Sequence, residues 1–263
     1  MKHGLFLPVF DELADPRVVA ALAAEAEQAG WDGVFVWDHL TYRAPVVGVA
    51  DPWVTLAAMA CATESVRLGP MVTPLPRRRP VKLAREVATL DRLSGGRVVL
   101  GVGIGGDSSG ELSATGEQLD DRVRGAMLDE GLEVVTTAWT GAELHHRGAH
   151  YVADGFAVLP TPVQPRVPVW VAVRYGRPRP LLRAARFDGV FPIEIDAPDQ
   201  LAETLAQLER PTDRPYDVAV GAQDDRDPGP YEAVGATWWM RGFSPYGITQ
   251  AQVRGVLSAG PQR

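Results

Sequence analysis

The stretch LAREVATLDRLSGGRVVLGVGIGG (residues 83–106) contains the end of a helix, a strand and a glycine-rich turn. Its first half continues an amphipathic helix predicted over Pro80–Leu93, and its second half holds a short apolar strand over Arg97–Val102. Strands that read as uninterrupted apolar runs between helices are typical of a parallel sheet buried on both faces. This segment is therefore interpreted as one helix–strand unit of such a sheet.

The same alternation of strand and helix extends in both directions. The expected strands are Gly4–Val9, Gly33–Trp37, Val66–Thr73, Arg97–Val102, Val169–Val173, Val190–Ile195, Asp217–Ala222 and Ala236–Met240. The expected helices are Asp15–Ala29, Asp51–Thr63, Pro80–Leu93, Gln118–Trp139, Pro180–Phe187, Ala197–Leu208, Pro230–Val234 and Thr249–Leu257. Eight such units in 263 residues favour a closed (β/α)8 barrel of the α/β class over an open doubly wound sheet.

The barrel is predicted to be one domain over residues 1–263, in a compact form with reduced insertions. Its longest connection, Thr140–Pro168, is predicted to be extended and to hold a small hairpin. The connection after the seventh strand is compressed, from Asp224 to Gly235. A short connection here predicts a small lid, and therefore an open site or one that a partner subunit completes.

Charge and composition exclude several classes of partner. The formal net charge is -7, whereas a nucleic-acid partner would require a basic surface. No apolar run approaches 18 residues, and the N-terminus lacks the apolar region of a signal peptide. The single cysteine, Cys61, cannot form an internal disulfide. We therefore expect a cytoplasmic protein that binds neither nucleic acid nor membranes.

The residues expected at the carboxyl ends of the strands, where barrels place their active sites, are poor in catalytic groups of their own. Neither of the two lysines, Lys2 and Lys82, falls at a strand end, which argues against Schiff-base chemistry. The histidines of the long connection lack metal-ligand spacing, so no metal site is expected. A site with few catalytic side chains is suited to an organic cofactor that supplies the reactive group.

The glycine-rich loop Gly101–Gly106 has two readings. It follows the fourth strand, and no acidic residue ends the next strand, so it does not match a Rossmann dinucleotide fingerprint. It is either a tight turn or a place where the backbone approaches a planar ring closely.

These segments together resemble the luciferase-like flavin- and deazaflavin-dependent oxidoreductases over nearly the whole chain. The resemblance is carried by residues 23–39 (AAEAEQAGWDGVFVWDH), 66–80 (VRLGPMVTPLPRRRP), 83–106, 182–192 (LRAARFDGVFP) and 235–239 (GATWW). It implies an oxidoreductase that acts on a small organic substrate, with FMN or coenzyme F420 across the strand ends. It also implies a homodimer, NAD(P)H as reductant, and a separate flavin reductase if the cofactor is FMN.

The resemblance also assigns roles to residues near the ring. Asp38-His39 matches the Asp-His pair of the second strand, so His39 is expected to face the ring and to act in proton transfer. Asp38 could instead be a helix cap or the partner of a loop ion pair. Met71-Val72, followed by Thr73, matches a bulge in the third strand where a non-prolyl cis peptide backs the ring; an ordinary trans strand end is the alternative.

Two further segments would bind the remainder of the cofactor. Gly103, Ile104 and Gly105 match the loop at the ring edge and the ribityl chain. Arg174-Tyr175-Gly176-Arg177 matches the loop that holds the cofactor phosphate, through backbone N–H groups and the following helix N-terminus.

Three features leave alternatives open. The basic run Arg77–Arg79 could be a solvated loop or could meet an anionic cofactor tail. Glu111 is followed by Leu112, whereas many relatives place an aromatic residue after this acid. Because of this departure and the short lid, a non-catalytic barrel that binds a flavin or pairs as a subunit remains an alternative.

Overall fold

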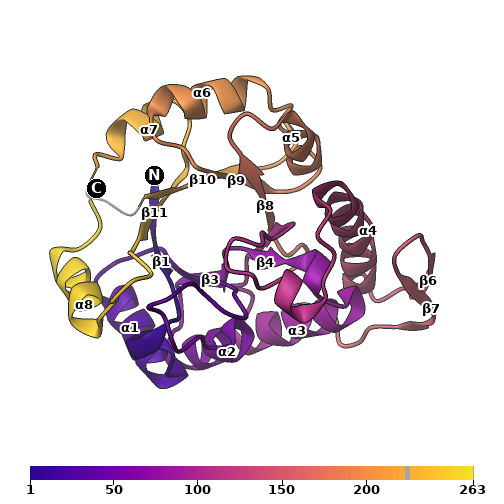
Figure 1. Ribbon diagram of the computed structural model, residues 1–263, viewed down its shortest axis with the longest axis horizontal. Coiled ribbons are helices and arrows are strands. Elements are labelled where there is room, and N and C mark those ends of the chain that lie inside the picture. Colours follow the sequence, from indigo (N-terminus) through magenta and orange to yellow (C-terminus); the bar gives the residue numbers. More distant parts are fainter. Residues whose placement is uncertain (223–225, 263) are drawn as a thin grey trace.

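The computed structural model describes residues 1–222 and 226–262, which form a (β/α)8 barrel (Figure 1). Its parallel strands are β1 (Lys2–Leu7), β2 (Gly33–Val36), β3 (Arg67–Pro70), β4 (Thr73–Pro74), β5 (Leu100–Gly103), β8 (Val169–Arg174), β9 (Gly189–Ile193), β10 (Asp217–Ala222) and β11 (Trp238–Gly242). Their order around the sheet is β3-β2-β1-β11-β10-β9-β8-β5-β4. The predicted fold class is confirmed.

The third strand differs from the prediction because it is broken. The sequence predicts one strand over Val66–Thr73, but β3 ends at Pro70 and β4 begins at Thr73, with a cis peptide between Met71 and Val72. On the N-terminal side of the break, a parallel bridge between Leu68 and Val98 closes the ring of strands. On the C-terminal side, β4 pairs with β5. The two pieces are thus one barrel strand, and eight strand positions remain.

The helices surround the strands as α1 (Pro16–Gln28), α2 (Pro52–Ala62), α3 (Pro80–Leu93), α4 (Asp121–Trp139), α5 (Pro178–Ala184), α6 (Pro198–Ala206), α7 (Gly229–Ala233) and α8 (Gln250–Ala259). Local capping decides where several of them begin. The Asp15 carboxylate accepts from the Arg17 amide, the Asp51 carboxylate accepts from the Val54 amide, and Thr249 begins a capping box. None of the described helices is both long enough and apolar enough to cross a membrane.

The connections bear out the compact form. The predicted hairpin exists as β6 (Glu143–Arg147) and β7 (Val152–Ala157), which pair antiparallel outside α4 (Figure 1). Helix α4 begins three residues later than predicted, because the Asp120 carboxylate accepts from the amides of Arg122 and Val123. Residues 223–225, which include the beginning of the short connection Asp224–Gly235, lie outside the described residues.

Large side chains fill the barrel interior near the amino ends of the strands. The ring centroid of Trp170 lies 5.4 Å from those of both Phe35 and Trp238. Glycines make room for these rings: a Cβ on Gly189 would lie 2.5 Å from Trp170 Cδ1, and one on Gly33 would lie 2.8 Å from Phe35 Cε2. This layer fills the barrel interior, so the loops at the carboxyl ends of the strands, where barrels of this class place their active sites, are the place to look for one.

Candidate active site at the carboxyl ends of the strands

A buried network of charged side chains joins the second, third and fourth barrel strands at their carboxyl ends. Asp38 and His39 follow β2, Arg77 ends the 3-10 helix η2 (Leu75–Arg77) after β4, and Glu111 lies in the loop after β5. Arg77 Nη2 donates to Asp38 Oδ1 at 2.7 Å, and its Nη1 donates to Glu111 Oε2 at 2.6 Å. The exposed side-chain fractions are 1% for Asp38, 2% for Glu111 and 4% for Arg77.

The Asp38 carboxylate is fully engaged by the protein. Thr73 Oγ1 donates to its Oδ2 at 2.8 Å, and Arg78 Nη2 contacts both carboxylate oxygens at 2.8 and 2.9 Å. With Arg77 added, three side chains hold this one group. Asp38 is therefore the partner of a loop ion pair, which was the alternative interpretation of this residue.

The solvated-loop interpretation of the basic run is wrong for two of its three arginines. The guanidinium groups of Arg77 and Arg78 turn inward, where Arg77 pairs with Asp38 and Glu111 and Arg78 pairs with Asp38. A buried carboxylate is costly unless it is paired and hydrogen-bonded, so the two acids require these two cations. Only Arg79, which precedes α3, is exposed.

His39 is held at one ring nitrogen and open at the other. Its Nδ1 lies 3.0 Å from Glu111 Oε1, and 26% of its side chain is exposed. Within the described residues, no protein group hydrogen-bonds to Nε2. Burial acts to raise the pKa of Glu111, but the hydrogen bonds from His39 and the Leu40 amide, with the charges of His39 and Arg77, lower that pKa below its ordinary value. An anionic Glu111 makes Nδ1 the donor, so a neutral His39 presents Nε2 as an acceptor.

Three aromatic rings pack near the imidazole of His39. Its ring centroid lies 5.1 Å from that of Tyr42, 5.9 Å from that of Trp37 and 6.0 Å from that of Phe10. Tyr42 in turn lies 6.0 Å from Tyr246, which comes from the segment after β11. The imidazole thus contacts both the charged network, through Glu111, and a group of aromatic rings.

The strand-three bulge and the glycine-rich loop lie together, as the resemblance implies. The Met71–Val72 peptide is cis, and Thr73 and Pro74 pair with Val102 and Gly103 of β5. A Cβ on Gly103 would lie 2.9 Å from Val72 Cγ2. Gly105 has φ +74°, and a Cβ there would lie 3.0 Å from Pro74 Cβ. Only glycine lets this loop approach the bulge so closely.

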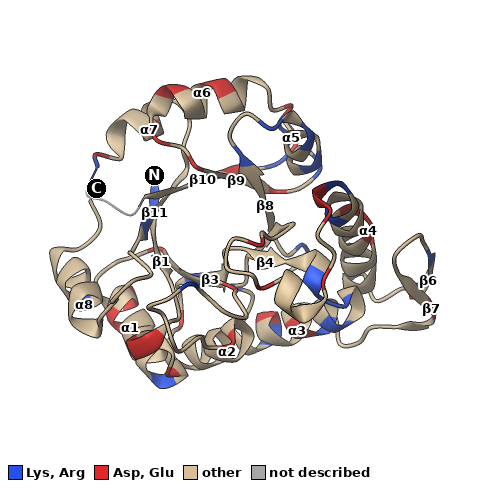
Figure 2. Ribbon diagram, viewed as in Figure 1, with Lys and Arg blue, Asp and Glu red and all other residues tan. Residues whose placement is uncertain are grey.

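The predicted phosphate loop lies across the barrel mouth from His39's strand, at the end of β8. It borders a cavity of about 150 Å³ whose other wall is α6, and the Tyr175 hydroxyl donates to Glu203 Oε2 at 2.5 Å. Figure 2 shows basic residues gathered on this loop and on α5. Arg174 Nε lies 3.1 Å from Glu194 Oε2, and both side chains are exposed.

Few backbone donors of this loop are available to a phosphate. The amides of Tyr175 and Arg177 already donate to Ile193 O and Arg174 O. The helix that follows, α5, has only seven residues, and two of its first three are prolines, which lack an N–H group. Any anion bound here would therefore depend on the arginine side chains.

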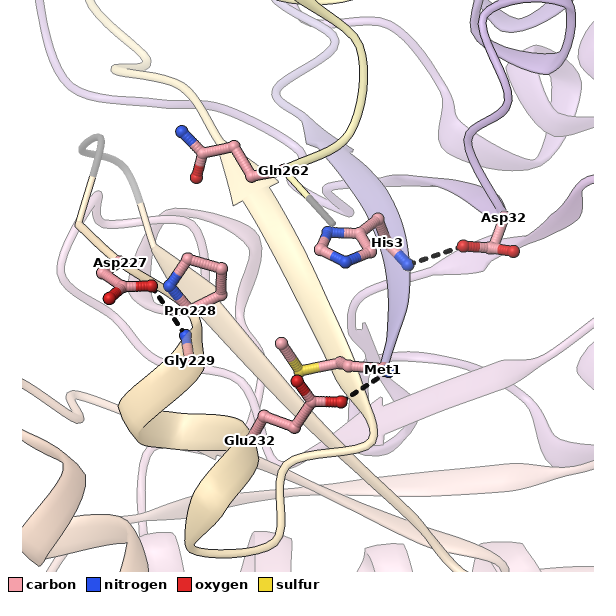
Figure 3. Close-up of a pocket in the computed structure, with 8 residues that line it drawn as sticks. All are labelled: Met1, His3, Asp32, Asp227, Pro228, Gly229, Glu232 and Gln262. Atoms are coloured by element: carbon pink, nitrogen blue, oxygen red, sulfur yellow. Dashed lines mark hydrogen bonds and ion pairs between the residues drawn. The ribbon is translucent and has the colours of Figure 1, made fainter.

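A second cavity, of about 680 Å³, lies at the opposite end of β1 (Figure 3). Met1, His3 and Asp32 line one side of it, and Asp227 and Glu232 line the other. The Met1 ammonium pairs with Glu232 Oε1 at 2.6 Å. Met1, His3 and Asp32 stand at the beginnings of β1 and β2, whereas His39 follows the end of β2, so this cavity is separate from the candidate site.

The chain is thus a parallel barrel with a cis peptide in its third strand and a histidine after its second. The sequence profile described as luciferase-like monooxygenase matches residues 1–223, and the chain belongs to that family. No cluster of three or more potential metal-ligating side chains occurs in the part of the chain that the structure describes.

Curated relatives share about a third of the aligned residues. The chain is 33% identical over 194 residues to an F420-dependent glucose-6-phosphate dehydrogenase of Nakamurella multipartita, which covers 72% of this chain and 56% of the relative. It is 34% identical over 192 residues to an uncharacterised protein of Mycobacterium tuberculosis, covering 65% of this chain and 64% of that protein. The chain spans only about half the length of the dehydrogenases that it matches.

Solved structures share the barrel. The F420-dependent tetrahydromethanopterin reductase of Methanopyrus kandleri superposes with a TM-score of 0.76 at 19% identity, covering 96% of this chain and 95% of the reductase. A monooxygenase of Streptomyces bottropensis superposes with a TM-score of 0.71 at 26% identity, covering 85% and 73%.

The sequence alone does not mark two residues of the network as functional. Glu111 is distinguished only by the residue after it, which departs from the family pattern, and Arg77 is one of three consecutive arginines. The sequence signal for Glu111 is an acid shortly after the glycine-rich loop, because that loop leaves β5, which the broken strand β3/β4 separates from His39's strand β2.

Proposed function

We propose that this protein is a deazaflavin-dependent oxidoreductase that moves a hydride between coenzyme F420 and a small organic alcohol or carbonyl compound. The observation that carries the proposal is the pair of His39 and Glu111, which leaves Nε2 without a hydrogen-bond partner among the described residues, at the end of the strand that pairs with β3. Hydride transfer from an alcohol requires a base for the hydroxyl proton, and a carboxylate-oriented imidazole is suited to that role. The relatives named as F420-dependent enzymes support the choice of cofactor.

The residues at the strand ends fit a planar cofactor. We assign the ring to the cradle of Met71, Val72 and Thr73 on one side and Gly103, Ile104 and Gly105 on the other. The fit rests on Gly103 and Gly105, because a side chain on either would fill the space between loop and bulge. Asp38 would contribute by fixing the bulge through Thr73 rather than by direct contact of its carboxylate.

We assign the cofactor's phosphate end to Arg174, Tyr175, Gly176 and Arg177. The guanidinium groups supply the positive charge there, and a guanidinium binds phosphate by paired hydrogen bonds. The ion pair between Arg174 and Glu194 would have to open for Arg174 to reach a phosphate.

When bound, the deazaflavin accepts or donates the hydride. The protein's own groups would manage the proton: His39 Nε2 takes it from the substrate hydroxyl during oxidation and returns it during reduction. Glu111 keeps Nδ1–H oriented and stabilises the imidazolium that forms. The aromatic wall of Phe10, Trp37 and Tyr42 limits water on the substrate side.

The remaining parts of the proposal concern partners and location. We propose a cytoplasmic homodimer that binds neither nucleic acid nor membranes. The net charge of -7 supports the absence of a nucleic-acid partner. FMN is the alternative cofactor; it would make the protein a monooxygenase supplied with electrons from NAD(P)H, through a separate flavin reductase. A non-catalytic flavin-binding or subunit-pairing barrel is the remaining alternative.

Fluorescence titration of the purified protein with F420 and with FMN tests the proposal. We expect F420 to bind more tightly than about 100 μM and FMN to bind more weakly. A panel of alcohols should then bleach the visible absorbance of F420 in the presence of the enzyme. Binding of neither cofactor would contradict the proposal, and preference for FMN would favour the monooxygenase. Binding of F420 without turnover of any alcohol or carbonyl compound would favour the non-catalytic barrel.

A further inference from the structure

We propose that Arg77 is a positioning residue of this site. Its guanidinium balances the negative charge of the Glu111 carboxylate, so that His39 stays a neutral imidazole with Nε2 free to accept a proton. The inference rests on the proposed function for its meaning in catalysis. Its geometric basis stands by itself: one buried guanidinium bridges two carboxylates that come from the ends of different strands.

The two carboxylates depend on Arg77 to different degrees. Without Arg77, Asp38 would keep Arg78 and Thr73 as partners. Among the described residues, Glu111 would keep His39 and the Leu40 amide, and of these two only His39 can carry a positive charge. The effect of Arg77 therefore falls mainly on Glu111 and, through it, on His39.

The charge balance gives the direction of this effect. With His39 neutral, the two acids Asp38 and Glu111 are balanced by the two cations Arg77 and Arg78. Removal of Arg77 leaves one excess negative charge in a buried network, and an excess negative charge favours uptake of a proton. The added proton would bind to the hydrogen-bonded pair of His39 and Glu111, and the pair would titrate as one unit.

Other groups that face the pair do not replace Arg77. Tyr42 packs against His39, and burial, followed by the neighbouring Tyr246 and the charge of Glu111, raises the pKa of its hydroxyl, so Tyr42 stays neutral. Arg43 is exposed, and its Nε donates to Ser108 O. Arg78 is directed to Asp38.

The experiment measures the titration of the His39 imidazole by NMR in the cofactor-free protein, with H39Q used to assign its signal. We expect R77Q to raise the midpoint by about one pH unit, a tenfold gain in proton affinity. R77K, which keeps the charge, should stay within about 0.3 unit of the wild type. The matched control is R79Q, which removes the same charge from an exposed neighbour and should not move the midpoint.

A second measurement links Arg77 to catalysis. In the F420-loaded enzyme, the acid limb of kcat/KM for alcohol oxidation should move to higher pH in R77Q and should return toward wild type in R77K. An unchanged His39 midpoint in folded R77Q would overturn the proposal. If R77Q does not fold, R77K decides, because a shift of a full unit in a variant that keeps the charge would also overturn it.

The two proposals fail separately. The NMR titration needs no cofactor, so it tests Arg77 even if F420 does not bind. Conversely, an F420-dependent turnover with an unmoved His39 midpoint would leave the proposed function intact and remove only the role of Arg77.

Discussion

Glu111 Oε1 lies 3.0 Å from His39 Nδ1, although the two residues are 72 positions apart and follow different barrel strands. This contact orients the imidazole and fixes which nitrogen is available to a ligand. Arg77 and the Leu40 amide hold the other oxygen of Glu111, so neither member of the pair can turn freely.

Removal of the imidazole should affect turnover more than cofactor binding. We expect H39A to lower kcat by about 10²–10⁴-fold, the usual contribution of a general base, while the Kd for F420 changes little. Steady-state kinetics and fluorescence titration measure the two quantities. Because His39 is the proposed base, turnover of H39A near the wild-type rate would exclude it from that role.

The space beside the bulge can be tested with one methyl group. G103A would place a Cβ 2.9 Å from Val72 Cγ2, so we expect F420 to bind about tenfold more weakly. The matched control is G106A in the same loop, since a Cβ there meets no atom within 4 Å. Equal cofactor affinities in the two variants would contradict the assignment of the ring to this cradle.

The ion pair at the phosphate loop predicts opposite effects from its two members. R174Q should weaken F420 binding, whereas E194Q should strengthen it by about two- to fivefold, because an exposed ion pair contributes at most about 1 kcal/mol. Both changes should shrink at high salt. The assignment of this loop would be lost if neither variant changed the affinity at low ionic strength.

The link between α1 and β3 predicts a pH-dependent stability. Burial acts to raise the pKa of Glu27, but hydrogen bonds from Ser65, Val66 and Glu64 outweigh it and lower that pKa to about 2. Because the folded pKa lies below the ordinary value of 4.5, Glu27 stabilises the fold above pH 4.5, and this contribution is lost as the pH falls toward 2.

Urea denaturation of the wild type and E27Q checks this prediction. The wild type should be more stable by roughly 2 kcal/mol at pH 7, a typical value for hydrogen bonds to a charged group. The difference should narrow between pH 4.5 and pH 3. A difference that stayed constant over this range would show that the charge of Glu27 is not the cause.

The parts of the fold that local sequence controls were predictable. Helix α3 occupies the predicted Pro80–Leu93 because Pro80 can begin a helix and Gly95-Gly96 follows its end. The eight strands were recognised because each is a short apolar run between helices. The break in the third strand was predicted only from the family resemblance, since nothing in the letters Met71-Val72 by themselves requires a cis peptide.

The sequence by itself determined the barrel and the place of the site, because periodicity, caps and apolar runs act over a few residues. Only the tertiary structure decided which charges meet. Arg77 reads as part of a basic surface run, yet it is buried because closure of the barrel brings the loops after β2, β4 and β5 together around it. Two buried carboxylates then select the nearest cations, and that choice depends on distances between strand ends that no local pattern encodes.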